Sequence, residues 1–474
     1  THQHKQNQQL PCFDLLESTN FESDVAFICH STPSYSGFSI AHIPRDGREC
    51  YNKAMRIYFS GIGGVGIGPL AEIAHDAGYD VCGSDQSASP LTAALMERGI
   101  HVALDQSGTF LQEEHDKQPF DWFVYTAALP ADHPELVLAH KLGIKTGKRD
   151  ELLAHIISDK NLKLVAVAGT HGKTTTTSMI VWTLQQLGIP VSYSVGSTLS
   201  FGPSGKFDPT SQFFIYECDE FDRNFLNFKP WLSLITSVDY DHPDTYPTEA
   251  DYLAAFRTFG RQSESVVAWQ ETAAFFDDDN VQVLTEYHPD IHLTGEHNRR
   301  NGMLTLEAVK RITETDEATI ITSINQFPGA GRRFEKLAEG LYSDYGHHPV
   351  EIKATLQLAQ ELSDHVVLVY QPHQNVRQHE IMTQYTADVF EAAETIYWLP
   401  TYLTRENPDL PVLTPQELTR HIVASRPDVV TFAELDDALW DHITASLDAG
   451  KLVLCMGAGT IDHWVRQHAT ALDA

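Results

Sequence analysis

Residues 164–177 of the chain read Leu-Val-Ala-Val-Ala-Gly-Thr-His-Gly-Lys-Thr-Thr-Thr-Thr. The apolar run at the start of this stretch is typical of a buried parallel strand. Gly169 and Gly172 form a turn, and the helical run 178–184 follows and ends near Gly188. A strand, a glycine-rich turn and a helix N-terminus form a phosphate cradle, because backbone N–H groups and the helix dipole both favour an anion there.

Two side chains in this turn point to a nucleoside triphosphate. Lys173 can reach the β- and γ-phosphates, and the hydroxyl of Thr174 can ligate Mg²⁺. Gly169 and Gly172 enclose two residues, whereas the usual P-loop has four between its glycines. We therefore interpret the stretch as a P-loop variant; the alternative is a chance Gly-Lys-Thr in a loop. The predicted ATP-binding residues of this turn are Gly169, Thr170, His171, Gly172, Lys173, Thr174 and Thr175.

Length and composition set the broad class. The chain has 474 residues, which suggests about three domains. No apolar run is long enough to span a bilayer and no signal peptide is visible. Six scattered cysteines predict reduced thiols and a cytoplasmic protein. The net charge of −31 argues against nucleic-acid and anionic-membrane partners.

The first 54 residues are polar and weakly patterned, and we expect an N-terminal extension there. Cys12, Cys29 and Cys50 fall within it, but their spacings match no metal template.

A second glycine-rich turn follows the extension. A strand from Met55 leads into Gly61, Gly63 and Gly66 in a Gly-x-Gly-x-x-Gly pattern, and Pro69 opens a helix. This pattern alone suggests NAD, but the later P-loop means that the turn need not hold a dinucleotide. Strand ends are where such sheets bind ligands. The candidate ligand-binding residues here are Gly61, Ile62, Gly63, Gly64, Val65, Gly66 and Asp85, with Thr126 and Ala127 after a further strand at 122–125.

Acidic residues end two strands downstream of the P-loop. The strand 212–216 runs into the block 217–222, and the strand 232–238 runs into Asp239, Asp241 and His242. Acids in this position can hold Mg²⁺. Solvated acidic loops are the alternative reading.

From about residue 327 the chain again alternates helices and strands, with a helix over 350–363 and strands at 366–370, 394–399 and 452–456. This pattern predicts a third α/β domain.

Together these blocks resemble the Mur ligases, which build the peptide of bacterial cell-wall precursors. Six motifs occur in the family's order, and with the flanking blocks the resemblance spans residues 56–460. The motifs are Gly169 to Thr175, Glu217 to Asp222, Asp241-His242, His297-Asn298 with Asn301, Arg332-Arg333-Phe334, and Asp344 to Pro349.

The resemblance implies a three-domain α/β protein: a Rossmann-like N-terminal domain for UDP-N-acetylmuramate (55–158), a central P-loop ATPase domain (159–326) and a Rossmann-like C-terminal domain that closes over the amino acid (327–474). It implies that ATP and Mg²⁺ activate the muramyl carboxylate as an acyl phosphate, which an amine then attacks. The expected substrates are small molecules, and the expected assembly is a monomer or homodimer.

The resemblance also assigns roles to residues. Lys173, Glu217 and His242 would be catalytic, and Thr174, Glu217 and His242 would ligate the metal. The remaining contacts would be Asn298 and Asn301 to adenine, Arg333 to the γ-phosphate, Asp344 to the ribose, and Tyr345, His373 and Arg377 to the incoming amino acid; the Gly61–Gly66 turn, Asp85, Thr126 and Ala127 would bind the UDP-sugar.

Two positions in the sequence indicate which amine the protein uses as its substrate. Arg257 lies 15 residues after His242, where several later members carry a carbamylated lysine. The arginine at this position suits the branch of the family that uses L-alanine. Gly61 to Gly64 and Gln371-Pro372-His373 also look most like that branch. Gln374 stands where that branch usually has arginine. The alternatives are the branch that attaches a whole tripeptide, a folylpolyglutamate-type ligase and a non-catalytic nucleotide sensor.

Overall fold

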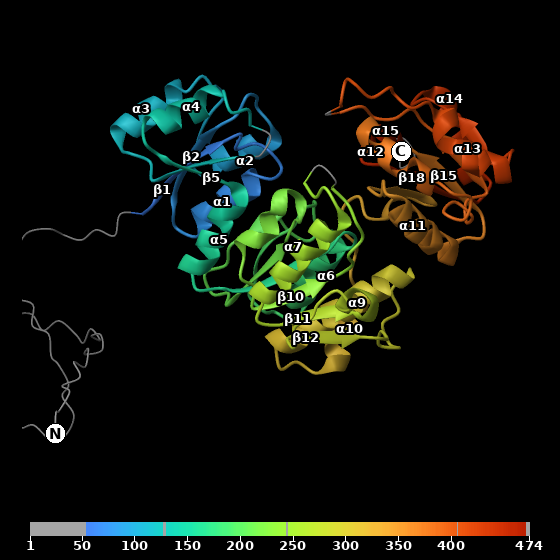
Figure 1. The fold of residues 1–474 in the computed structure, drawn as a ribbon, viewed down its shortest axis with the longest axis horizontal. Helices are drawn as coiled ribbons and strands as arrows, with labels where there is room; N and C mark the ends of the chain where they lie inside the picture. Colours follow the sequence, from blue (N-terminus) through green and yellow to red (C-terminus); the bar gives the residue numbers. More distant parts are fainter. Residues whose placement is uncertain (1–53, 127–128, 243–244, 405, 471–474) are drawn as a thin grey trace, which may run out of the picture. The chain divides into compact units, whose positions relative to one another are not determined.

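The computed structural model describes residues 54–126, 129–242, 245–404 and 406–470. These residues form three mostly parallel β-sheets, each covered by helices (Figure 1). The predictions for the N-terminal extension, for Cys12, Cys29 and Cys50 within it, and for Ala127 lie outside the described residues. The three-domain α/β fold class is confirmed.

The N-terminal sheet has five parallel strands in the order β3-β2-β1-β4-β5. The order reverses between β1 and β4, so the carboxyl ends of these two strands flank the crevice where such sheets bind ligands. The strands are β1 (Arg56–Ser60), β2 (Asp80–Ser84), β3 (His101–Ala103), β4 (Trp122–Tyr125) and β5 (Lys145–Lys148). The helices are α1 (Gly68–Asp76), α2 (Pro90–Glu97), α3 (Thr109–Lys117), α4 (Pro134–Lys141) and α5 (Arg149–Asp159).

The central sheet has seven strands in the order β12-β11-β10-β6-β9-β7-β8, and only the β7–β8 pair is antiparallel. The strands are β6 (Lys163–Ala168), β7 (Ser192–Ser194), β8 (Gly205–Lys206), β9 (Phe213–Glu217), β10 (Leu232–Ile235), β11 (Val266–Trp269) and β12 (Val281–Leu284). The helices are α6 (Lys173–Gln186), η1 (Phe221–Asn227), α7 (Glu249–Gln262), α8 (Gln270–Ala273), α9 (Glu296–Ile312) and α10 (Glu317–Asn325).

The C-terminal sheet has six strands in the order β13-β14-β18-β15-β16-β17, and only β13–β14 is antiparallel. The strands are β13 (Glu335–Ala338), β14 (Leu341–Asp344), β15 (Val366–Tyr370), β16 (Thr395–Trp398), β17 (Val430–Phe432) and β18 (Leu452–Met456). The helices are α11 (Pro349–Leu362), α12 (Asn375–Ile381), η2 (Met382–Gln384), α13 (Pro415–Ser425), α14 (Asp437–Asp448) and α15 (Ile461–Ala469).

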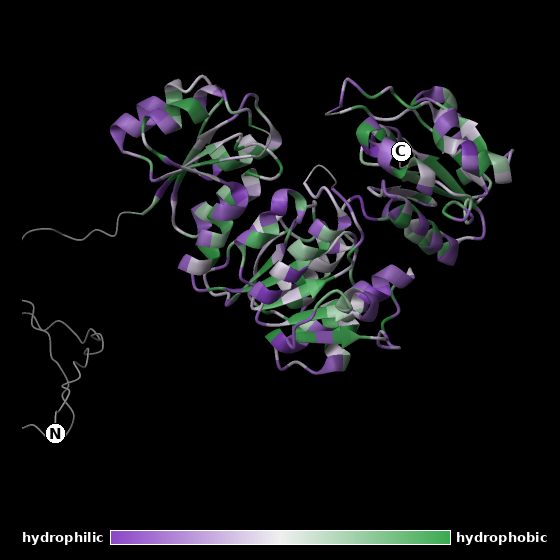
Figure 2. Cartoon of the chain, viewed as in Figure 1, coloured by the Kyte–Doolittle hydropathy of each residue, from purple (hydrophilic) through white to green (hydrophobic). Residues whose placement is uncertain are grey.

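Sequence patterns explain these elements. The central strands are continuous apolar runs because both of their faces are covered; every residue of β15 and β18 is buried. Figure 2 shows the same contrast, with hydrophobic strands beside helices of mixed character. Pro349 opens α11, and the Glu351 side chain accepts the backbone N–H of His348 at its N-terminus.

One hydrophobic core continues from the N-terminal sheet to the central sheet. Ile156 and Ile157 of α5 belong to the same buried cluster as Phe225 of η1 and Phe256 of α7. The helix α5 therefore fixes the P-loop strand to the sheet that precedes it.

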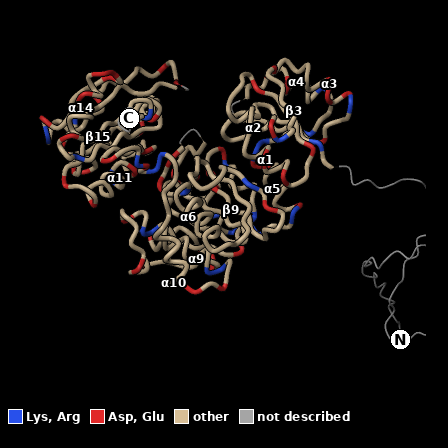
Figure 3. Tube along the Cα trace, turned by 180° about the vertical axis from the view of Figure 1, so that it is seen from behind, with Lys and Arg blue, Asp and Glu red and all other residues tan. Residues whose placement is uncertain are grey.

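Acidic residues are spread over the helices of all three sheets (Figure 3). In the described part of the chain, no helix combines the length and the hydrophobicity needed to cross a membrane. Cys82, Cys218 and Cys455 are buried free thiols, as the reading of reduced cysteines predicts.

Some element limits differ from the prediction. The strand predicted over 232–238 ends at Ile235, because Thr236 and Ser237 turn to contact the P-loop. The sequence also suggests a linker over residues 158–161 ahead of the P-loop strand; this segment is partly helical, since α5 continues to Asp159.

Candidate nucleotide and reaction site

The predicted P-loop lies between β6 and α6. Gly169 has φ +132°, and a Cβ atom there would lie 2.3 Å from the hydroxyl oxygen of Thr236. Gly172 has φ +84° and precedes the first residue of α6. Both positions therefore need glycine, and the turn directs the N-terminus of a 14-residue helix at the site.

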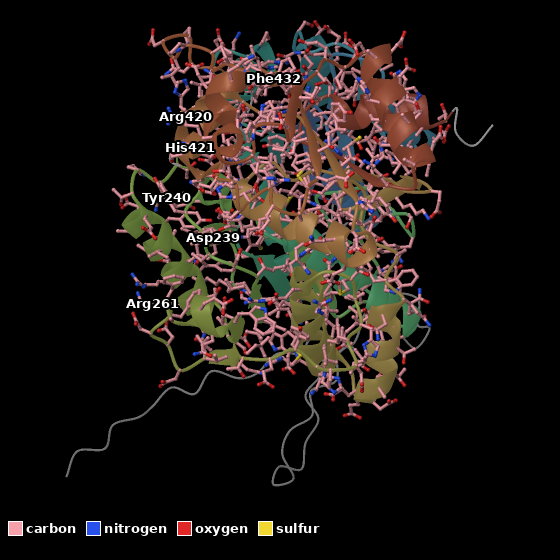
Figure 4. The ribbon with its side chains drawn as sticks, turned by 90° about the vertical axis from the view of Figure 1, so that its right-hand side faces the viewer. Asp239, Tyr240, Arg261, Arg420, His421 and Phe432 are labelled. Atoms are coloured by element: carbon pink, nitrogen blue, oxygen red, sulfur yellow. The ribbon has the colours of Figure 1, made fainter. Side chains whose placement is uncertain are left out.

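The end of β10 holds this loop in place. The backbone N–H of Thr170 donates to the carbonyl of Ser237 at 3.1 Å, and the N–H of His171 donates to the Ser237 hydroxyl at 3.0 Å. The Thr170 hydroxyl donates to the carbonyl of Asp239 at 2.8 Å. Asp239 and Tyr240, labelled in Figure 4, belong to the segment that follows β10. The P-loop is therefore anchored by the segment that follows β10.

Lys173 is held by a carboxylate that the sequence analysis did not single out. Its ammonium group lies 2.7 and 3.0 Å from the two carboxylate oxygens of Glu220, whose side chain is 1% exposed. Burial lowers the pKa of Lys173, but the carboxylates of Glu220 and Asp219 outweigh it and raise that pKa overall. Lys173 is therefore a cation that Glu220 holds in place beside the P-loop.

Glu217 joins Thr174 at the carboxyl end of β9. The Thr174 hydroxyl donates to one carboxylate oxygen at 2.7 Å, and the N–H of Gly196 donates to the other at 2.8 Å. A hydroxyl and a carboxylate in contact are ligands that suit Mg²⁺, which keeps several waters and takes other ligands from substrate phosphates. Thr174 and Glu217 thus fit the predicted metal site.

His242, the third predicted metal ligand, has different neighbours. Its Nε2 atom lies 3.8 Å from Glu220 and 3.7 Å from Asp241. Across the described ranges, no group of three His, Cys, Asp or Glu side chains is arranged to hold a metal ion. The role of His242 as a metal ligand stays a prediction.

A cavity of about 770 Å³ lies beside the P-loop. Residues associated with the central and C-terminal sheets line it, and the apolar side chains of its lining, among them Met179, Phe275 and Leu358, are suited to a planar base. Of the predicted ATP-binding residues, it is lined by His171, Gly172, Thr174, Thr175, Asn298, Asn301, Arg333 and Asp344.

His171 stands between this cavity and the C-terminal sheet. Its Nδ1 lies 3.3 Å from Glu351, and its buried Nε2 lies 3.6 Å from the Asp239 carboxylate but makes no hydrogen bond with the described residues. Burial lowers the pKa of His171, but Glu351 and Asp239 more than offset this and raise it overall. An unsatisfied buried nitrogen at the cavity wall is the kind of group that a phosphate oxygen would satisfy.

Asp344 is enclosed by backbone. Its two carboxylate oxygens accept the N–H groups of Phe334 and Gly346, each at 2.7 Å. Burial raises the pKa of Asp344 to about 6, and Arg333 and the two N–H donors offset only part of that effect. The carboxylate thus fixes the turn that carries Arg333, and its predicted contact with ribose would be an additional one.

The raised pKa of Asp344 predicts a pH-dependent stability. The folded chain holds this proton more tightly than the unfolded chain, so its contribution to stability is full below about pH 4 and is lost as the pH rises through about 6. Asp344→Asn removes this loss. The difference in free energy of unfolding between Asp344→Asn and wild type should therefore shift in favour of the variant by up to about 3 kcal/mol from pH 4 to pH 7. Urea unfolding across this range measures it, and parallel profiles for the two proteins would contradict the assignment.

A second cavity, of about 750 Å³, is lined by residues associated with all three sheets. Lys173, Glu217 and His242 line it together with Tyr345, His373 and Arg377. The two cavities share a wall, which consists of His171, Gly172, Thr174, Arg333 and Glu351. The Arg333 guanidinium lies 3.4 Å from the Thr174 hydroxyl at that wall. The predicted catalytic and amino-acid residues therefore converge on this second cavity, which we call the reaction chamber.

Arg377 bridges two sheets across this chamber. Its guanidinium donates to both carboxylate oxygens of Asp241, at 3.0 and 3.3 Å, and lies 2.5 Å from Nε2 of His347. Burial lowers the pKa of His347 to about 4, so this imidazole is neutral at physiological pH. The ring of His373 stacks on Tyr402 at 5.8 Å. An incoming carboxylate would compete with Asp241 for Arg377.

The N-terminal glycine-rich turn forms at the end of β1. The N–H of Gly63 donates to Asp85 at 2.8 Å, so the predicted acid does contact the predicted turn. Behind them Glu135 is fully buried and accepts hydrogen bonds from the hydroxyls of Ser60 and Ser84, at 2.6 and 2.8 Å. This carboxylate ties the carboxyl ends of β1 and β2 together. Val65 and Gly66 reach the second cavity, whereas Gly61 to Gly64, Asp85 and Thr126 line neither cavity.

Comparison with protein families gives three matches in order along the chain. Residues 56–161 match the model described as Mur ligase family, catalytic domain; residues 167–280 match the Mur ligase middle domain; and residues 332–459 match the Mur ligase glutamate ligase domain.

Curated relatives and solved structures agree with these matches. A protein from a Nocardioides species, named UDP-N-acetylmuramate–L-alanine ligase, is 31% identical over 86% of this chain and 94% of its own length. One of the same name from Agathobacter rectalis is 31% identical over 87% and 97%. The crystal structure of a UDP-N-acetylmuramate-alanine ligase from Thermotoga maritima has a TM-score of 0.67 at 23% identity, covering 88% of this chain and 99% of that one. A murein peptide ligase from Psychrobacter arcticus has a TM-score of 0.58 at 21% identity, with coverage of 88% and 99%. The two structures show a shared fold.

Proposed function

The chain belongs to the Mur ligase family, and on that premise we propose that it joins UDP-N-acetylmuramate to L-alanine with ATP as the energy source. Members of the family are ATP-dependent ligases. The relatives that carry the L-alanine name match nearly their whole length, which supports this amine over the tripeptide.

One observation carries the proposal: the nucleotide-sized cavity and the reaction chamber meet at the P-loop. Thr174 and Arg333 line both, and Lys173 lines the chamber. A triphosphate with its base in the first cavity would place its terminal phosphate at this wall. A carboxylate in the chamber would then lie beside the phosphorus that it must attack.

The reaction proceeds by two displacements in this proposal. A carboxylate oxygen of UDP-N-acetylmuramate bonds to the γ-phosphorus, and ADP leaves. The amine of L-alanine then bonds to the acyl carbon, phosphate leaves with that oxygen, and the amine loses a proton. Phosphorylation is needed because a free carboxylate is a poor electrophile. Lys173 and Arg333 stabilise the charge of the phosphoryl group in transfer.

Thr174 and Glu217 would hold Mg²⁺ in this site. The bound ion would neutralise phosphate charge and so favour the first displacement. The proposed ATP site also includes Asn298, Asn301 and Asp344, and the proposed amino-acid site includes Tyr345, His373 and Arg377. His242 belongs to the proposal as a residue of the chamber wall.

We assign residues 55–158, 159–326 and 327–474 to UDP-sugar binding, to ATP binding and to closure over the amino acid. Because ATP and UDP-sugars are held in the cytoplasm, we place the protein there, as a monomer or homodimer.

A panel of amines tests the proposal. Phosphate release is measured with ATP, Mg²⁺ and UDP-N-acetylmuramate, together with L-alanine, L-serine, glycine or L-alanyl-γ-D-glutamyl-meso-diaminopimelate. L-Alanine should give the highest kcat/KM, and omission of UDP-N-acetylmuramate should abolish release. If the tripeptide is used far better than L-alanine, the tripeptide replaces L-alanine as the proposed amine. Phosphate release that needs neither an amine nor a UDP-sugar would contradict ligase activity.

A further inference from the structure

We propose that Arg149 binds an oxyanion of the UDP-sugar, at the point where the N-terminal glycine-rich turn faces the P-loop. The inference rests on the proposed function and adds a residue to it. Neither the sequence motifs nor the family resemblance singled Arg149 out.

The position of Arg149 in the fold is that of a ligand-binding residue. It directly follows β5 and is the first residue of α5, so it lies at the carboxyl edge of the N-terminal sheet. Its guanidinium contacts the glycine-rich turn: a Cβ atom at Gly66 would lie 3.2 Å from Nη1 of Arg149. The same side chain lines the reaction chamber.

Arg149 is the charged residue that the N-terminal sheet contributes to this chamber. Among the described lining residues, that sheet and its connections supply Val65, Gly66, Pro69 and Arg149. The other sheets contribute six carboxylates to the lining, which repel an anionic substrate in the absence of cations. They are Glu217, Asp219, Glu220, Asp241, Glu351 and Glu380.

Two of the other cations in the chamber are already engaged. Lys173 lies 2.7 Å from Glu220, and Arg377 lies 3.0 Å from Asp241; each of these two cations has a side chain that is 15% exposed. Arg149 is 33% exposed, and both of its contacts with the carboxylate of Asp150 are 3.3 Å long. Charge-assisted pairs are usually shorter, at about 2.7–2.9 Å.

Asp150 has a second partner besides Arg149. The phenol of Tyr216 on β9 donates a hydrogen bond to Oδ1 of Asp150, the oxygen that Nη2 of Arg149 contacts, whereas Nε of Arg149 contacts Oδ2. Asp150 is 3% exposed and so is fixed by the surrounding core. The pair therefore orients the guanidinium without using its full hydrogen-bonding capacity, and the outer N–H groups can meet a carboxylate or phosphate in a fork geometry.

UDP-N-acetylmuramate offers two such groups, the diphosphate and the lactyl carboxylate. UDP-N-acetylglucosamine has the same diphosphate but lacks the carboxylate, so comparing the two ligands identifies the contact. Calorimetry on the full chain measures both dissociation constants, with ATP affinity measured in parallel as a check on the fold.

Arg149→Met should weaken UDP-N-acetylmuramate binding by about 10- to 100-fold and leave ATP affinity within about twofold. An equal loss for both UDP-sugars assigns the diphosphate, and a loss confined to UDP-N-acetylmuramate assigns the carboxylate. Arg261→Met is the matched control, because Arg261 lies on α7, is 58% exposed and does not line the chamber; it is labelled in Figure 4.

Unchanged affinity of Arg149→Met for both UDP-sugars would overturn the inference. If this variant loses ATP binding as well, and so does not fold, Arg149→Lys decides. Lysine keeps the positive charge but lacks the paired N–H donors of the guanidinium, so this variant should bind UDP-sugars several-fold more weakly than wild type. Wild-type affinity of Arg149→Lys would overturn the inference. Failure of the wild type to bind UDP-N-acetylmuramate would instead contradict the proposed function.

Discussion

Replacing Lys173 by alanine is expected to lower kcat by at least about 10³-fold while UDP-N-acetylmuramate still binds. The ammonium group lies at the P-loop and lines the chamber where the phosphoryl group would be transferred. Removing one preorganised charge from such a site costs about 10²–10³ in rate, and Lys173 acts on the group with the most charge. Steady-state phosphate release and calorimetry with UDP-N-acetylmuramate measure the two effects.

The pairing of Lys173 with Glu220 adds a control to this experiment. The single variant leaves a buried carboxylate unpaired, at a cost to stability of about 3–5 kcal/mol. The double variant Lys173→Ala/Glu220→Gln should recover most of this stability and none of the activity. Lys163→Ala, at the exposed amino end of β6, should behave as wild type. Loss of UDP-N-acetylmuramate binding in the folded double variant would contradict separate sites for the two nucleotides.

Glu217→Gln is expected to lower kcat by at least about 10²-fold and to raise the Mg²⁺ concentration needed for half-maximal rate. The carboxylate accepts from Thr174 and from the Gly196 N–H, and an amide can accept only through its oxygen and brings no charge to the metal. The fold should be retained, because Glu217 is only partly buried at the end of β9. Activity titrated against Mg²⁺ and thermal unfolding measure the two properties.

Glu264→Gln is the matched control for this prediction, since Glu264 is an exposed acid in the loop that precedes β11. Wild-type activity of Glu217→Gln at limiting Mg²⁺ would show that the acidic block after β9 has no part in holding the metal.

Local sequence patterns predicted the parts of the site that are continuous in the chain. The apolar run at 164–168, the two glycines and the hydroxyl-rich start of the helix predict the P-loop. The prediction succeeds because Gly169 and Gly172 both adopt positive φ, which favours glycine at these positions. Asp85, which the sequence predicts as a UDP-sugar-binding residue, contacts Gly63 of the glycine-rich turn, and its contact with the ligand stays a prediction.

Contacts between distant segments could not be predicted in this way. Arg377 and Asp241 are 136 residues apart, and no periodicity links α12 to the loop after β10. Glu220 lies just beyond the end of β9, and its contact with Lys173 joins two segments that are 47 residues apart. Arg149 belongs to no sequence motif, and its contact with Gly66 depends on how β5 lies in the sheet.

The transfer of an oxygen atom tests the central claim most directly. UDP-N-acetylmuramate labelled with ¹⁸O in both carboxylate oxygens is incubated with the protein, ATP, Mg²⁺ and L-alanine, and the phosphate and the amide product are analysed by mass spectrometry. Activation of the carboxylate by ATP predicts one ¹⁸O atom in each phosphate and one in each amide. Phosphate without ¹⁸O, formed together with ADP, would contradict the account, because the γ-phosphoryl group would then have passed to water and not to the muramyl carboxylate.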